Sequence, residues 1–271
     1  MGKFAGRMLI AAATLLGLGV TAEAATCGRT SAGFEAWKQE FAQQAAANGV
    51  GRRGLAALEG ARYASKTIAA DRNQKSFKLS FERFMQVRGA STIISKGKSL
   101  KRSNARLFTN IERRYGVPAG PLLAIWGMET GFGSFMGNQN TISAITTLAY
   151  DCRRPGFFTP HALAALELVD RGSLSASSVG AMHGEVGHTQ FLPANVLRYG
   201  ADGNGDGRVD LRNKADALAS TANFLRGHGW RPGAGYQPGQ ANFNAIAGWN
   251  SASVYQRAIA VIGAQIDGAG S

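Results

Sequence analysis

Cysteine is scarce in this chain, since only Cys27 and Cys152 occur among its 271 residues. Neither has a neighbouring Cys or His at ligand spacing, which excludes the usual zinc patterns. In an oxidising compartment the two could form a single disulfide that ties the N-terminal region to the middle of the fold. Two unpaired, buried thiols are the alternative.

Long apolar runs are missing after the first twenty residues, so no later segment is expected to cross a membrane. At the start, Lys3 and Arg7 precede the apolar run from Met8 to Val20, and Ala22-Glu23-Ala24-Ala25 supplies small residues at an A-x-A site. This pattern predicts a signal peptide over residues 1–25, cleaved near Ala24 or Ala25, and export to the periplasm. An uncleaved membrane anchor is the alternative.

Negative charge is also scarce: 17 Asp and Glu residues stand against 30 Lys and Arg residues, a formal net charge of +13. A basic surface favours an anionic polymer, by an attraction that salt screens. No nucleic-acid motif with interleaved aromatic residues is present. In the periplasm, the cell wall or anionic lipid head groups are therefore the expected partners, and nucleic acid is not.

Alternating strand patterns are hard to find, and helical spacing dominates, which predicts a mainly α fold. We expect a single unit over residues 26–271, with a helical N-terminal part over 26–115 and a core over 116–271. In the core, Thr159 as N-cap and Pro160 at the first helical position predict one helix start. Further helices are expected from the cap Asn213 to Gly229 and over residues 254–266.

Glu129 is a carboxylate in an apolar setting. If a helix opens at Pro121, Leu122, Ile125, Trp126 and Glu129 share one face, so the acid points the same way as the core. Lost hydration raises the pKa of such a carboxyl, and the negative end of the helix raises it further. The expected product is a proton donor at neutral pH; a buried Glu satisfied by an Arg or by backbone groups is the alternative.

A second polar motif is the acidic loop that begins at Asp202. Oxygen ligands fall at its first, third and fifth positions, and Gly207 occupies the sixth, which is how an EF-hand loop begins. The twelfth position is Asn213 instead of Glu, and the next carboxylate is Asp216. The pattern predicts a structural Ca²⁺ site; a metal-free turn is the alternative. The predicted ligands are Asp202, Asn204, Asp206, Arg208 through its backbone carbonyl, and Asp216. No organic cofactor is expected.

Several ordered motifs together resemble the membrane-bound lytic transglycosylase B family of bacterial cell-wall enzymes. The resemblance extends from about Phe34 to the last expected helix. The matching segments are Asp71-Arg72-Asn73-Gln74, Tyr115-Gly116-Val117-Pro118, Leu123 to Thr130 with Gly133, Thr147 to Asp151, Gly187 to Pro193, and Ala247-Gly248-Trp249-Asn250.

This resemblance implies a lysozyme-like helical catalytic fold, an EF-hand-like loop and one essential glutamate, Glu129. The implied reaction cleaves the β-1,4 bond between N-acetylmuramic acid (MurNAc) and N-acetylglucosamine (GlcNAc) in peptidoglycan glycan strands. It uses no water and leaves a 1,6-anhydroMurNAc end. Glu129 would first protonate the leaving oxygen and then deprotonate the C6 hydroxyl. A monomer is expected.

Other positions carry over from the family motifs. Gln190 matches a substrate-side glutamine, although it could instead brace its loop. Asn250 is placed to hydrogen-bond the muramoyl acetamido group. Trp249 stands where the family has Tyr, so a role for a phenol hydroxyl at that position is not supported. The acidic loop is also a feature of the family.

One segment departs from the family pattern: His183-Gly184-Glu185-Val186-Gly187 stands where many members read Ala-Gly-Ala-Met-Gly. Glu185 either hydrogen-bonds its own loop, or acts as a second carboxylate that orients the substrate or raises the pKa of Glu129. If Glu185 positioned water, hydrolysis would compete with ring closure. The four histidines, His161, His183, His188 and His228, are expected to be structural or on the surface.

Two other functions remain open. The first is a muramidase that uses water, on a related fold. The second is a non-catalytic, basic wall-binding protein stabilised by calcium.

Overall fold

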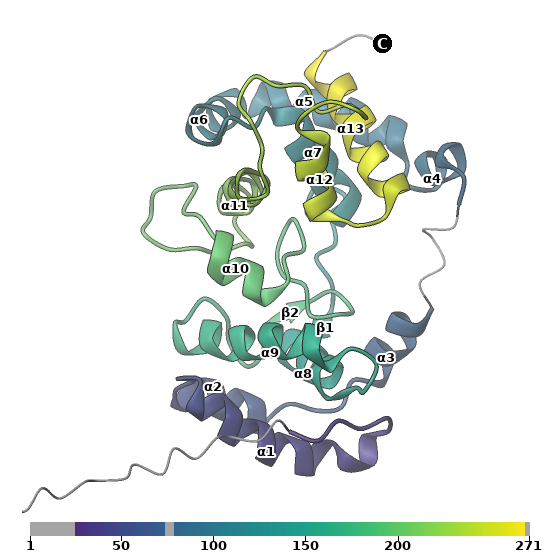
Figure 1. Ribbon diagram of the computed structural model, residues 1–271. Coiled ribbons are helices and arrows are strands. Elements are labelled where there is room, and N and C mark those ends of the chain that lie inside the picture. Colours follow the sequence, from purple (N-terminus) through teal and green to yellow (C-terminus); the bar gives the residue numbers. More distant parts are fainter. Residues whose placement is uncertain (1–24, 74–78, 269–271) are drawn as a thin grey trace, which may run out of the picture.

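A computed structural model describes residues 25–73 and 79–268 and is mainly helical, as predicted (Figure 1). The signal peptide predicted over residues 1–25 lies outside the described residues except for Ala25, and so do Gln74 and Phe77. The helices are η1 (Ser31–Gly33), α1 (Phe34–Ala47), α2 (Arg52–Glu59), α3 (Ser65–Arg72), α4 (Phe81–Val87), α5 (Ala90–Ser103), α6 (Ala105–Tyr115), α7 (Ala119–Thr130), α8 (Thr141–Tyr150), α9 (Pro155–Asp170), α10 (Pro193–Tyr199), α11 (Lys214–Gly227), α12 (Phe243–Trp249) and α13 (Ser253–Asp267).

Two short strands complete the fold. Strands β1 (Gln139–Asn140) and β2 (Val179–Gly180) pair antiparallel, with Gln139 opposite Gly180. Within the described part of the chain, no helix combines the length and apolar character that a membrane crossing requires.

The buried apolar residues form two clusters. One unites α1 and α2 with α8 and α9, which lie together in the lower half of Figure 1. The other unites α4 to α7 with α10 to α13. Each cluster combines residues from before and after residue 115, because α1 and α2 bury their apolar faces against the later helices α8 and α9. Packing therefore does not divide at the expected boundary between 115 and 116.

Helix α7 lies at the centre of the second cluster and is apolar on all sides, which is typical of a fully buried helix. Leu122, Leu123 and Ile125 have no exposed surface. The helix begins at Ala119, two residues earlier than expected from Pro121, and Gly131 ends it in the left-handed conformation, with φ 57°. Helix α13 packs tightly on it, since a Cβ on Gly120 would lie 2.3 Å from the Gly263 carbonyl oxygen.

The predicted start of α9 is wrong. The helix begins at Pro155, and Pro160 lies inside it. Both prolines suit a first turn, but the earlier one occupies the first position, where no backbone N–H is needed. Pro160 then removes only the hydrogen bond to the carbonyl four residues before it. In α11 the predicted cap is found, because the Asn213 side chain accepts a hydrogen bond from the Ala215 N–H at 2.9 Å.

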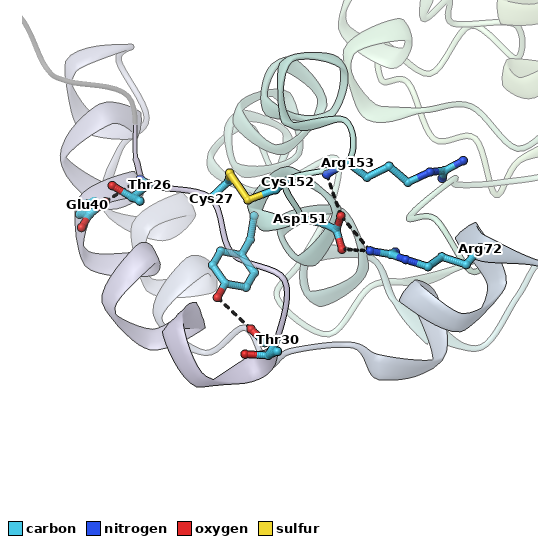
Figure 2. The surroundings of a disulfide bond; sticks show 9 residues. Thr26, Cys27, Thr30, Glu40, Arg72, Asp151, Cys152 and Arg153 are labelled. Carbon is cyan, nitrogen blue, oxygen red and sulfur yellow. Dashed lines mark hydrogen bonds and ion pairs between the residues drawn. A yellow bond between two sulfur atoms is a disulfide. The ribbon is translucent and has the colours of Figure 1, made fainter.

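Cys27 and Cys152 form a disulfide across 125 residues of sequence, with their Cα atoms 5.0 Å apart (Figure 2). Backbone hydrogen bonds flank it: the Gly28 N–H donates to the Tyr150 carbonyl at 3.0 Å, and the Cys152 N–H donates to the Gly28 carbonyl at 3.1 Å. The Tyr150 hydroxyl also donates to the Thr30 carbonyl at 2.8 Å. The N-terminal segment is thereby joined to the end of α8.

We predict that replacing both cysteines with serine lowers the free energy of unfolding by about 2–5 kcal/mol, because the open chain gains conformational freedom when unfolded. Denaturant unfolding of the oxidised protein and the C27S/C152S variant measures this change. Wild-type protein under reducing conditions is the matched control and should behave like the variant. Identical midpoints for the oxidised protein and the variant would contradict the prediction.

Candidate active site

Glu129 is the next-to-last residue of α7, and its carboxylate is held by side chains from two other helices. Its Oε1 atom accepts a hydrogen bond from the Tyr255 hydroxyl of α13 at 2.6 Å and one from the Trp249 Nε1 of α12 at 3.1 Å. No described residue hydrogen-bonds the second oxygen, Oε2. Hydroxyl and indole groups donate to Oε1, which leaves Oε2 as the oxygen on which a neutral Glu129 can carry its proton.

Burial raises the pKa of the Glu129 carboxyl, because the charged form loses its hydration. The hydrogen bonds from Tyr255 and Trp249 lower the pKa, the negative charge of Glu185 raises it, and the cation of Arg88 lowers it. The balance lies above the ordinary value. Burial also raises the pKa of Tyr255 well above its usual range, and the Glu129 charge adds to this, so the phenol remains a neutral donor.

Two cavities of about 400 Å³ each meet at Glu129. Both are lined by Glu129, Glu185, Trp249 and Asn250. The first also has Arg88, His183, Ser251 and Tyr255 in its wall, and the second has Ala181, Gln190, Phe191, Leu192, Asn195, Phe224 and Gly248. The predicted substrate residues therefore lie around Glu129, and the space continues on both sides of the acid.

Gln190 both lines this cleft and braces its own loop. Its Nε2 donates to the Gly187 carbonyl at 2.7 Å, and its backbone has a positive φ of 57°, which is uncommon for a residue other than glycine. Asn250 is oriented by its neighbour, because its Oδ1 accepts the Ala252 N–H at 2.9 Å. The indole of Trp249 contributes a hydrogen bond to Glu129 where the family pattern has a phenol.

Glu185 combines the two interpretations that the sequence left open. It hydrogen-bonds its own loop, since its Oε2 accepts the His183 N–H at 3.0 Å and its Oε1 lies 3.2 Å from His183 Nδ1. Its charge also raises the pKa of Glu129, and it lines both cavities.

Of the four histidines, which were expected to be structural or on the surface, His183 lines the first cavity and contacts Glu185. The other three have structural partners: the Trp126 indole for His188, the Ala194 N–H for His161 and the Phe224 carbonyl for His228. Sequence reasoning also missed Tyr255 and Arg88. Tyr255 occupies an apolar position of the last helix, and only the crossing of α13 with α7 reveals its contact with Glu129.

The acidic loop is organised by hydrogen bonds to its carboxylates. Asp202 accepts the N–H groups of Gly205 at 2.6 Å and Gly207 at 2.8 Å, which lower its pKa. Asp216 has no exposed surface and accepts the N–H groups of Gly203 at 2.9 Å and Asp210 at 2.8 Å, so it does fold back onto the loop. Among the described residues, no three His, Cys, Asp or Glu side chains gather closely enough to hold a metal.

A desolvated carboxyl where two cavities meet can protonate a bond of a bound polymer, and a carboxyl acid of raised pKa is what glycan-cleaving enzymes use. The chain belongs to the transglycosylase SLT domain family, whose model matches residues 33–240. It is 35% identical over 125 residues to the membrane-bound lytic murein transglycosylase B of Escherichia coli (strain K12), covering 44% of this chain and 34% of that protein. The match thus spans about a third of that relative's length.

Solved structures agree with this assignment. SltB3 from Pseudomonas aeruginosa, in complex with NAG-anhNAM-pentapeptide, is 29% identical and superposes with a TM-score of 0.79, covering 87% of this chain and 80% of that chain. The Escherichia coli lytic transglycosylase Slt35, in complex with calcium, is 21% identical with a TM-score of 0.77, covering 90% of this chain and 96% of that chain. The lysozyme-like lytic transglycosylase fold is therefore confirmed.

We predict that Y255F raises the pKa of Glu129 further, because it removes the hydroxyl that stabilises the charged carboxylate. Titration of the Glu129 side-chain carbon by NMR measures the change. As a control, Y236F removes the hydroxyl that donates to Asp267 at 2.8 Å and should leave Glu129 unaffected. A lower pKa of Glu129 in Y255F would refute the assigned role of this hydrogen bond.

Proposed function

We propose that this protein is a peptidoglycan lytic transglycosylase. It cleaves the MurNAc-β-1,4-GlcNAc bond of glycan strands and forms a 1,6-anhydroMurNAc end. The observation that carries this proposal is Glu129, a carboxyl of raised pKa at the meeting point of two cavities. Membership of the transglycosylase SLT family and the ligand of the SltB3 structure support it.

In the first step, the neutral carboxyl protonates the glycosidic oxygen through Oε2, the oxygen that carries its proton. Negative charge then develops on Glu129. Tyr255 and Trp249 already donate hydrogen bonds to Oε1, so the new carboxylate is stabilised without rearrangement. The same donors lower the pKa of Glu129, while burial raises it, and this opposition keeps both protonation states accessible.

In the second step, the Glu129 carboxylate takes the proton of the C6 hydroxyl, and that oxygen closes the anhydro ring. One residue acts as acid and then as base because its protonation state changes between the steps. We assign Gln190 and Asn250 to hydrogen bonds with the sugar amide and hydroxyl groups, and Trp249 to contact with a sugar ring. All three line the cleft beside Glu129.

The setting of the enzyme follows from the sequence. Residues 1–25 would act as a signal peptide, and residues 26–271 would act in the periplasm as one monomeric catalytic unit. The formal net charge of +13 would favour the anionic wall by electrostatic attraction.

The loop from Asp202 to Asp216 is proposed to bind Ca²⁺ in a structural, EF-hand-like manner. Its oxygen donors are of the type that calcium prefers: the side chains of Asp202, Asn204, Asp206 and Asp216, and the backbone carbonyl of Arg208. Asn204 Nδ2 lies 2.9 Å from Asp206 Oδ2, so these two side chains converge. The calcium in the Slt35 structure supports this proposal. Bound calcium would join the end of α10 to the start of α11.

We predict that E129Q lowers wall-cleaving activity by at least ~100-fold, because the amide keeps the shape of the side chain but has no acidic proton. Release of soluble fragments from purified peptidoglycan measures the loss. E112Q is a matched control, since Glu112 is an exposed carboxylate on α6.

Mass spectrometry of the wild-type products tests the reaction type. Anhydro ends lack the elements of water that reducing ends retain. If every product carried a reducing end, the protein would be a hydrolytic muramidase. Undiminished activity of E129Q would reject the assigned mechanism altogether.

We predict that calcium raises the melting temperature and that chelation lowers it, because a ligand that binds only the folded state stabilises it by about 2.7 kcal/mol at a hundredfold excess over its Kd. Thermal unfolding with calcium or with a chelator measures the shift. A D202N/D206N variant should not respond to calcium. An equal response of variant and wild type would place the ion elsewhere, and no response of the wild type would exclude the site.

A further inference from the structure

His183 lies between two carboxylates. Its Nδ1 is 3.2 Å from Glu185 Oε1, and its Nε2 is 4.0 Å from Asp71 Oδ1. The first distance is that of a hydrogen bond, and the second is a longer contact between the ring and a charged carboxylate. Burial lowers the pKa of His183, but the hydrogen bond and charge of Glu185 and the charge of Asp71 outweigh it, so the pKa is raised.

Asp71, near the end of α3, is held in place by two arginines. Its side chain is only 2% exposed and is held by Arg153 and Arg154, which lie at the start of α9. Burial raises the pKa of Asp71, but the hydrogen bonds from these two arginines lower it by more. Asp71 therefore remains charged, and its position is set by α3 and by the two arginines that precede α9.

Glu185 lines both of the cavities that meet at Glu129. The other groups around Glu129 are Trp249 from α12, Tyr255 from α13 and the cation of Arg88, which follows α4. Arg88 and Glu185 line the same cavity. Both oxygens of Glu185 are engaged by His183, Oε2 by the backbone N–H and Oε1 by the ring. The carboxylate is therefore held in the wall of the cleft.

We propose that His183 and Glu185 are a positioning pair, in which the backbone N–H and the ring of His183 hold the Glu185 carboxylate in the wall of the cleft at Glu129, where its charge favours the protonated form of Glu129. The pair replaces the two alanines of the family pattern. It touches no reacting atom in this role. The negative charge of Glu185 disfavours ionisation of Glu129, and the hydrogen bonds from His183 determine where that charge lies. The inference rests on the proposed function of Glu129 as the acid.

The test is the pH dependence of kcat/KM on purified peptidoglycan. The alkaline limb of this profile reports loss of the proton from the free enzyme's acid. Removing the negative charge in E185Q lowers the pKa of Glu129, so the limb should move to lower pH. E185A should move it in the same direction. H183A should move the limb as well, because it removes the ring that holds Glu185 Oε1 and leaves only the backbone N–H on Oε2. E112Q should leave the limb in place.

A merely structural role would lower activity equally at all pH values and would leave the limb unmoved. An unmoved limb in folded E185Q and E185A would overturn the proposal, and an unmoved limb in H183A would remove His183 from it. NMR titration of the Glu129 carboxyl in the same variants gives a readout that does not depend on activity. If the wild type formed no anhydro product, the proposed function would fail, while a lower Glu129 pKa in E185Q would still support the pair.

Discussion

The site depends on one physical conflict, the burial of a carboxyl that also receives two hydrogen bonds. Burial favours the neutral form of Glu129, while the donors Tyr255 and Trp249 favour the charged form. Burial alone would favour only the neutral carboxyl, and the hydrogen bonds alone would favour only the carboxylate. Because the donors come from α12 and α13, the balance depends on how these two helices pack against α7. The same contacts that form the apolar core therefore set the chemistry of the acid.

The two apolar clusters explain why a cleft exists beside this acid. Helices α8 and α9 bury their faces with α1 and α2, whereas α7 packs with the helices of the other cluster. The segment over residues 181–191 supplies lining residues to both cavities beside Glu129. It is braced internally, by Gln190 on the Gly187 carbonyl and by Glu185 on His183. Polar side chains can thus line the cavities directly beside the apolar core.

Local patterns in the sequence predicted the features that depend on local physics. Helical spacing and Gly131 placed Glu129 in the last turn of a buried helix, and Asn213 predicted the start of α11. Pro155 and Pro160 are equally suited to a first helical turn, so the start of α9 could not be chosen from spacing alone. Tyr255 and His183 carry no local signal of function, because each is brought to Glu129 or Glu185 by contacts between distant segments. For the same reason, both apolar clusters combine residues from either side of the boundary predicted at residue 115.

The departure at Glu185 shows how a second carboxylate can be accommodated beside the buried carboxyl of Glu129. An unpaired charge in a partly buried cleft loses hydration and would be expected to protonate or to turn towards the nearest cation. Here His183 supplies hydrogen bonds to both oxygens, and Asp71 stabilises the positive charge of the ring from the other side. The cost of burying Glu185 is thus offset outside the cleft, by α3 and the start of α9.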